Sequence, residues 1–305
     1  MNPQYLQTLR LLTQVAPIIF QGGQFALKGG TAINLFWREM PRLSVDLDLV
    51  FVDHAQPREQ ALATINQAVR AMAARLDRRG FQTHTVSSQG VGQIKLLVRR
   101  DRIEIKVEIN PVMRGTLQPV VNRSLSAAAS EALMADLALP LVSFEDAYGG
   151  KLVAAMDRQH PRDIFDVKGL VDAEGITPAV RQSFVAYLAS HNRPIHEVLA
   201  PVERDIRQDY ERTFRGMTAE PVELEALFDV RRELFETLPH SLGSNERQFL
   251  FSLAQARPNW ELLDIPHLAD LPAIRWKLKN LQRLQSENRS KFEDQALQVS
   301  RLLDA

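Results

Sequence analysis

Two aspartates one residue apart, Asp46 and Asp48, are the side chains whose type and spacing could do chemistry. They lie in SVDLDLVFVD, where polar and apolar residues alternate as in a β-strand. Side chains at i and i+2 share one side of a strand, so the two carboxylates stand together while Val45, Leu47 and Leu49 face the core. Like charges at that distance repel, and a cation between them offsets the repulsion. The spacing predicts a cation site; a solvated acidic edge strand is the alternative.

A third carboxylate could come from the segment RIEIKVEI. Its isoleucines and valine fill one face of a strand, which leaves Glu104, Lys106 and Glu108 on the other. If this strand neighbours the first, Glu108 or Glu104 completes a three-acid site for two divalent cations. Such a pair of cations clamps the attacking and leaving oxygens of a phosphoryl displacement. Alternating charges on a solvent-exposed strand face are the simpler interpretation.

The pair Gly29-Gly30 stands between a strand-like segment, FALK, and a helical one, TAINLFW. One interpretation is a turn that needs a positive φ angle. The other is a set of exposed N–H groups that hold an anion. No Gly-Lys-Ser/Thr follows and GxGxxG is absent, so neither a Walker loop nor a dinucleotide fingerprint is present.

The letters DLDLV also satisfy the DxDx(T/V) signature of aspartate-based phosphatases. That chemistry follows an apolar strand near the start of its domain. Here Pro41-Arg42-Leu43-Ser44 precede Asp46, after a helix and a glycine turn. We therefore discount the phosphatase interpretation.

The composition limits the class of protein. The chain has 305 residues, 45% hydrophobic and 24% charged, with no cysteine and a net charge of zero. These values indicate a globular protein without disulfides or thiolate zinc sites, and we expect it in the cytoplasm. No apolar run approaches the roughly 18 residues of a membrane span, and no secretory signal is evident. With no net charge, binding to nucleic acid would need a local patch.

The order of segments predicts an α+β fold. A first helix from about residue 3 to 16 is disturbed by Pro17, and a long helix covers about 60 to 79. Three strand-like pieces follow, FQTHTV, QIKLLVR and RIEIKVEI. From Ser143 onward the pattern is helical, beginning with FEDAYGGKLVAAMDR and PRDIFDVKGLVD. We predict a mixed domain over residues 1–175 and a helical domain over 176–305.

Three blocks in order carry a resemblance to a known family: LKGGTAINLFW…PRLSVDLDLVF, then IKVEINP, then FEDAYGGKLVAAMDRQHPRDIFDV. Together they resemble the AbiEii/AbiGii toxins, the nucleotidyltransferases of AbiE-type and MenAT-type toxin–antitoxin pairs within the polymerase-β-like superfamily. The resemblance covers roughly residues 25 to 170. It implies an N-terminal polymerase-β-like nucleotidyltransferase domain with a mixed sheet, followed by a C-terminal helical bundle.

The resemblance also implies roles for individual residues. Asp46 and Asp48 would bind Mg²⁺ with Glu108, which precedes Ile-Asn-Pro as in the family and so ranks above Glu104. Lys151 would place a point charge on the β- and γ-phosphates, and Asp163 would orient Lys151 or a metal-bound water. Asp166, three residues on, is interpreted as structural. The residues that would hold the triphosphate of an NTP are Gly29, Gly30, Thr31 and Ser44.

The implied reaction is attack by an acceptor hydroxyl on the α-phosphate of an NTP, with release of pyrophosphate. In relatives the acceptor is often the 3′ end of tRNA, and a cognate antitoxin is the implied protein partner. An arginine-bearing helix around Arg70–Arg79 and the segment Pro272–Ala305, with seven Lys/Arg against four Asp/Glu, are compatible with RNA. Both are equally typical of solvated helix faces. The rival hypotheses are transfer to a small molecule or a protein, and a catalytically inactive binding module.

Overall fold

The computed structural model describes residues 3–87 and 94–304. The chain folds into two compact units. Unit 1 comprises 1–147 with 215–221, and unit 2 comprises 148–214 with 222–305. The division falls within one helix, α5 (Phe144–Asp157), whereas the sequence placed a boundary near residue 175. The extent of the nucleotidyltransferase domain stays a prediction.

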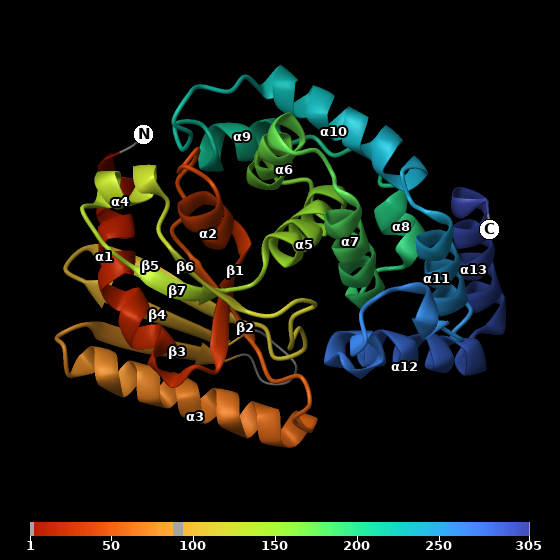
Figure 1. The fold of residues 1–305 in the computed structure, drawn as a ribbon, viewed down its shortest axis with the longest axis horizontal. Coiled ribbons are helices and arrows are strands. Elements are labelled where there is room, and N and C mark those ends of the chain that lie inside the picture. Colours follow the sequence, from red (N-terminus) through yellow and green to blue (C-terminus); the bar gives the residue numbers. More distant parts are fainter. Residues whose placement is uncertain (1–2, 88–93, 305) are drawn as a thin grey trace. The chain divides into compact units, whose positions relative to one another are not determined.

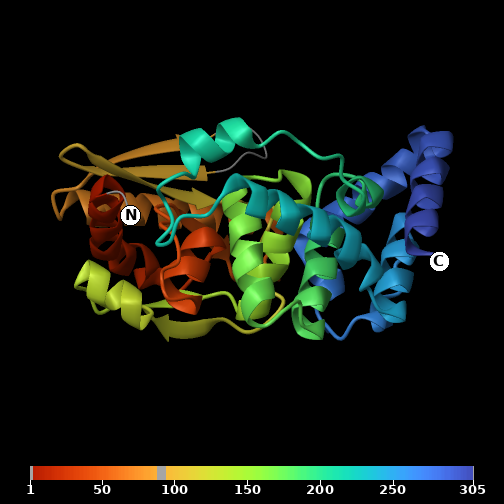
Figure 2. The ribbon, with the colours of Figure 1, turned by 90° about the horizontal axis from the view of Figure 1, so that it is seen from above.

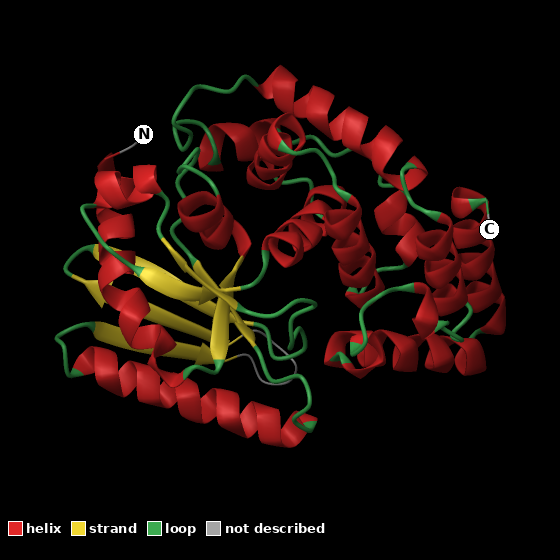
Figure 3. Cartoon of the chain, in the orientation of Figure 1, coloured by secondary structure: helices red, strands yellow, loops and turns green. Residues whose placement is uncertain are grey.

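Unit 1 is built on a seven-stranded mixed sheet in the order β3-β4-β5-β2-β1-β7-β6 (Figures 1 and 3). Parallel pairing joins β2 to β5 and β1 to β7, and the other neighbours are antiparallel. The strands are β1 (Phe25–Lys28), β2 (Leu47–Phe51), β3 (Gln82–Ser87), β4 (Ile94–Arg100), β5 (Ile103–Ile109), β6 (Val121–Ser124) and β7 (Ala138–Leu141). The α+β class predicted from the sequence is confirmed.

Alternation along the central strands explains the core of unit 1. Leu47 and Leu49 of β2 and Val107 of β5 are fully buried among the side chains of α1 (Pro3–Ile19) and α3 (Arg58–Asp77). α1 lies against β5, and α3 lies against β3 and β4. Polar side chains occupy the opposite face of the same strands. This alternation was predicted from the sequence and is confirmed.

The remaining helical elements of unit 1 are short. They are η1 (Phe20–Gly22), α2 (Gly29–Ala32), its π-helical continuation η2 (Ile33–Trp37) and α4 (Ala127–Leu133). α4 and the antiparallel pair β6–β7 that it connects were not predicted, and Figure 2 shows them at one side of the unit. Two boundaries differ from expectation: α1 continues through Pro17 to Ile19, and β2 begins at Leu47, after Asp46. Gln93, the expected start of β4, lies outside the described residues.

Unit 2 is helical throughout its described residues (Figure 3). α12 packs on α7 and α13, and α11 packs on α7 and α13, while α6 packs on α10 (Figures 1 and 2). The bounds are α6 (Pro161–Ala173), α7 (Pro178–Ser190), α8 (Ile195–Leu199), α9 (Arg207–Thr213), α10 (Leu224–His240), α11 (Ser244–Ala254), η3 (Trp260–Leu262), η4 (Leu268–Asp270), α12 (Pro272–Glu287) and α13 (Arg289–Leu303). Among the described residues no helix is long and apolar enough to cross a membrane.

Candidate active site

The acids predicted on two strands are neighbours in the sheet. β2 and β5 run parallel, and Asp48 is the register partner of Glu108. Asp46 lies two residues before Asp48, so it shares the polar face rather than the core face. The sequence could predict each strand, whereas the pairing of residues sixty positions apart comes from the fold. We call Asp46, Asp48 and Glu108 the acid group.

Lysines stand beside the acid group. Lys106 Nζ lies 3.8 Å from Asp46 Oδ1 and 3.6 Å from Glu108 Oε1, and Lys95 Nζ lies 2.9 Å from Glu108 Oε1. The hydrogen bond from Lys95 to Glu108, and then the charge of that carboxylate, raise the pKa of Lys95 above its ordinary value. The Lys106 ammonium thus lies close to both Asp46 and Glu108 and offsets the repulsion between these carboxylates. The sequence analysis did not assign Lys106 or Lys95 to the site.

The donor set of the acid group suits a hard cation. Mg²⁺ takes oxygen ligands and is commonly held by one or two carboxylates. Asp46 and Glu108 already reach one common cation, the Lys106 ammonium. Among residues 3–87 and 94–304, however, no three His, Cys, Asp or Glu side chains are arranged to hold a metal ion. The assignment of Asp46, Asp48 and Glu108 as metal ligands stays a prediction.

The glycine turn approaches this face so closely that no side chain fits there. A Cβ at Gly29 would lie 2.5 Å from Asp48 Oδ2, and Gly29 has a φ of +75°. A Cβ at Gly30 would lie 2.6 Å from Arg42 Nη2 and 2.8 Å from Ser44 Oγ. The turn interpretation therefore holds for Gly29, where positive φ favours glycine. Both glycines bring the backbone against Asp48 and Ser44.

Thr31 joins the glycine turn to the residues that precede β2. Its Oγ1 lies 2.5 Å from the Asp46 carbonyl oxygen and 3.1 Å from Ser44 Oγ. Thr31 is buried, so its hydroxyl fixes the backbone that carries Asp46. The four predicted nucleotide-binding residues Gly29, Gly30, Thr31 and Ser44 are therefore together in the structure. Their contact with a triphosphate stays a prediction.

Arg42 is a residue that the sequence analysis missed. It is buried at 2% exposure, donates from Nη1 to the Leu43 carbonyl oxygen at 2.9 Å, and lies against Gly30. A short bridge from Arg42 to Thr218 holds the segment that carries it. A lone arginine between Pro41 and Leu43 has no periodic signal, and burial of its charge depends on a strand partner 176 positions away.

Unit 2 holds the other predicted catalytic residues, in a group whose lysine and aspartates are buried and whose arginine is exposed. Lys151 Nζ donates to Asp163 Oδ1 at 2.8 Å and lies 3.0 Å from Asp166 Oδ2. Arg158 Nε donates to Asp163 Oδ2 at 2.5 Å. Burial opposes ionisation of Asp163, but the charges of Lys151 and Arg158 and their hydrogen bonds lower its pKa below the ordinary value. Asp166 contacts Lys151 as Asp163 does. We call Lys151, Arg158, Asp163 and Asp166 the lysine group.

Close packing of two helices fixes the position of Lys151. A Cβ at Gly149 would lie 2.7 Å from the backbone carbon and the Cβ of Ser183 on α7. Glycine at this position therefore lets α5 and α7 approach each other, and Lys151 follows two residues later. Gly149 thus has a packing reason, distinct from that of Gly29-Gly30.

One lysine of the segment Pro272–Ala305, Lys277, does not lie on a solvated helix face. Lys277 is buried, and its Nζ donates to the carbonyl oxygens of His191 at 2.9 Å and Arg193 at 2.5 Å. Burial lowers the pKa of Lys277 to about 8. Its ammonium thus binds the carbonyl oxygens of the chain after α7 rather than contributing to a basic surface.

Comparisons with known proteins identify the family. The sequence model described as "Nucleotidyl transferase AbiEii toxin, Type IV TA system" matches residues 10–279. No curated protein sequence matches the chain. Among solved structures, the nucleotidyltransferase toxin MenT4 from Mycobacterium tuberculosis H37Rv matches with a TM-score of 0.61 and 19% identity, covering 92% of this chain and 94% of that one. At that identity the likeness shows the fold. Because the family model spans most of its residues, the chain belongs to the AbiEii family of nucleotidyltransferase toxins of type IV toxin–antitoxin systems.

Proposed function

We propose that this toxin transfers a nucleoside monophosphate from an NTP to a hydroxyl of an RNA acceptor, the 3′ end of tRNA, and releases pyrophosphate. The observation that carries the proposal is the acid group: Asp48 and Glu108 are paired in register on parallel strands, with Asp46 on the same polar face. Crowded carboxylates are costly without a cation. In a nucleotidyltransferase, the repulsion between these carboxylates would be offset by the Mg²⁺ that they hold.

Asp46, Asp48 and Glu108 would hold Mg²⁺. When bound, Mg²⁺ would neutralise charge on the phosphates that react. The glycine turn and Ser44, held by Thr31, would set the triphosphate beside these acids through N–H and hydroxyl donors. Asp48 lies directly against Gly29, so the turn and the carboxylate keep a fixed relation.

Lys151 and Asp163 are proposed to act together in catalysis. Asp163 holds the Lys151 ammonium in a single position by a 2.8 Å hydrogen bond. Because the neighbouring cations lower the pKa of Asp163, its carboxylate is ionised at neutral pH and keeps the hydrogen bond from Lys151. Lys151 would offer its remaining N–H to the phosphates of the NTP. Arg158 is the second cation on Asp163.

The partners follow from the same proposal. The protein would act in the cytoplasm on an NTP and an RNA, and a cognate antitoxin would oppose it. Four arginines on α3 and at its end, Arg70, Arg75, Arg78 and Arg79, lie within ten residues and support an anionic partner.

The test is incubation of the protein with total RNA, Mg²⁺ and each α-labelled NTP in turn, beside Asp46→Ala. Label in tRNA-sized RNA with the wild type alone is the expected result. Label in a protein or a small molecule would mean that the acceptor is that molecule rather than RNA. No transfer to any acceptor, with no NTP consumed, would contradict the proposal.

A further inference from the structure

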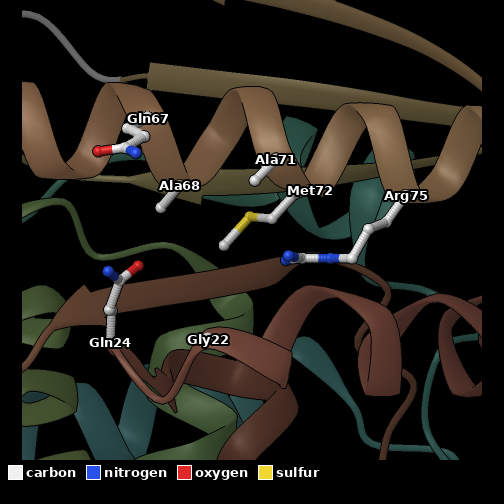
Figure 4. A pocket seen from close by; sticks show the side chains of 7 residues that line it. All are labelled: Gly22, Gln24, Gln67, Ala68, Ala71, Met72 and Arg75. Carbon is white, nitrogen blue, oxygen red and sulfur yellow. The ribbon is translucent and has the colours of Figure 1, made fainter.

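A cavity in unit 1 lies apart from the acid group. It measures about 230 Å³ and is bounded by α3 on one side and by the turn from η1 to β1 on the other. Its lining residues are Gly22, Gln24, Gln67, Ala68, Ala71, Met72 and Arg75. Figure 4 shows Met72 and Arg75 extending from α3 toward the opposite wall, from which Gln24 extends. Side chains from two separate segments thus converge on one space.

Arg75 is the notable side chain of this cavity. Its Nε is buried and has no hydrogen-bond partner among the described residues. A guanidinium carries five N–H donors and no acceptor, and it stays charged at any physiological pH. A guanidinium in the wall of this cavity, for which the described residues supply no hydrogen-bond partner at Nε, suits a ligand that brings oxygens to its other N–H groups.

Two neutral amides complete the polar lining. Gln24 and Gln67, whose amides can both donate and accept, are the other polar residues of the lining, whereas Ala68, Ala71 and Met72 form its apolar part. Of the residues that the structure describes, no carboxylate lines the cavity. An anion therefore meets one full positive charge, amide donors and no like charge. A cation would meet only Arg75 and two amide oxygens.

The surroundings favour a phosphate group over a weaker anion. Arg78 and Arg79 follow the last residue of α3, Asp77, and Arg70 lies about two turns earlier in the helix; none of the three arginines is in an ion pair within the part of the chain that the structure describes. Their summed potential favours a doubly charged oxyanion more than a singly charged one. The two Nη groups of a guanidinium also match two oxygens of a phosphate.

We propose that this cavity is a binding site for a phosphate group, in which Arg75 holds two phosphate oxygens and Gln24 and Gln67 bind the group attached to it. The phosphate can belong to a free nucleotide or to a polynucleotide backbone. The volume accommodates a phosphate with part of its sugar and is smaller than the roughly 300–1,000 Å³ of drug-sized pockets. The site does not depend on the proposed nucleotidyl transfer.

Isothermal titration of the full chain in EDTA tests the proposal with three probes: inorganic phosphate, AMP and a ten-nucleotide oligouridylate. EDTA removes metal-dependent binding of a nucleotide at the acid group. We expect phosphate and AMP to bind, and Arg75→Gln to weaken both by at least about tenfold. Tighter binding of AMP than of the oligonucleotide assigns the site to free nucleotides, and the reverse order assigns it to a polynucleotide.

Two matched variants complete the test. Arg78→Gln removes an equal charge from the end of the same helix without touching the cavity, and we expect less than about a threefold change. Ala71→Leu fills the space without changing charge, and we expect it to abolish binding. Asp48→Ala should bind all probes as the wild type does, since the acid group is not involved. Absence of binding to every probe, or equal losses in Arg75→Gln and Arg78→Gln, would overturn the proposal.

Discussion

The acid group of unit 1 and the lysine group of unit 2 use the same residue types in opposite ways. In the acid group, lysines that are 35% and 39% exposed stand beside the carboxylates, and Lys106 keeps distances of 3.6 and 3.8 Å. In the lysine group, Lys151 is 6% exposed and its aspartates 1%, with contacts of 2.8 and 3.0 Å. Exposed ion pairs contribute little and exchange partners, whereas buried pairs are costly to break. We therefore expect another cation to be able to replace the lysines beside the acid group, whereas Lys151 stays fixed in the lysine group.

Removing the cation of the lysine group should give the largest effect. Lys151→Met removes the cation that pairs with both buried aspartates and leaves Asp163 with Arg158, so we expect a loss of about 3–5 kcal/mol in the free energy of unfolding. Urea denaturation measures it. Lys168→Met is the matched control: this lysine pairs with Asp172 on the solvated side of α6, and we expect a change below about 1 kcal/mol. Equal losses in the two variants would remove the contrast between the groups.

The next effect concerns catalysis at the acid group. Glu108→Gln removes one carboxylate charge from the face shared with Asp48, and we expect nucleotidyl transfer to fall by at least about 100-fold with little change in stability. Glu104→Gln, on the same face of β5, is the control. Its carboxylate pairs with Arg99 and should be dispensable. A labelled-NTP assay compares the two, and a larger loss in Glu104→Gln would reverse the choice of the third acid.

The close approach of the glycine turn predicts a smaller effect. Gly29→Ala places a methyl group 2.5 Å from Asp48 Oδ2 at a φ of +75°, and we expect a loss of about 1–3 kcal/mol together with a loss of transfer activity. Gly23→Ala has a similar φ of +66°, but its new methyl group would meet open space among the described residues. Gly23→Ala therefore introduces backbone strain without a contact like that with Asp48. If both variants retain activity equally, the contact with Asp48 has no catalytic consequence.

Part of the pH dependence of stability should come from His160, near the lysine group. Burial, and then the charge of Arg162, lower the pKa of His160 from 6.5 to about 4. The unfolded chain therefore binds a proton that the folded chain does not between these values, and stability falls as pH decreases from 6.5 toward 4. His160→Asn keeps an N-cap acceptor for the Arg162 N–H and removes this proton. We expect a smaller drop in Tm between about pH 7 and about pH 5 than in the wild type, and an equal drop in the two proteins would contradict this assignment.

The contrast between the groups also separates what a sequence can predict from what it cannot. Alternation predicted that Asp46 and Asp48 share a side, and the family resemblance predicted that Asp163 on the next helix serves Lys151. Lys106 reaches Asp46 only because β2 and β5 pair in parallel, a choice made by the whole sheet. Lys277 shows the limit most clearly: its helix is amphipathic, but burial against the carbonyl oxygens after α7 depends on tertiary packing.

Lys106 offers the last test of the comparison. If its ammonium is an exchangeable cation of the acid group, it competes with a divalent metal for Asp46 and Glu108. Lys106→Gln removes that competitor while keeping a side chain of similar length, so metal should bind about three- to tenfold more tightly. Titration with Mn²⁺, followed by electron paramagnetic resonance in the absence of nucleotide, measures the affinity directly.

Arg99→Gln is the control for this titration because it removes a charge from the same sheet face at a position paired with Glu104. Weaker Mn²⁺ binding in Lys106→Gln would mean that the lysine holds the acids in place for the metal rather than competing with it. The acid group would then be a fixed arrangement like the lysine group, with its cation exposed but not exchangeable. Tighter Mn²⁺ binding in Lys106→Gln, with Arg99→Gln unchanged, would establish that the lysine–carboxylate contacts of the acid group can be replaced by a metal. The buried lysine–carboxylate contacts of the lysine group would then differ from them in being fixed.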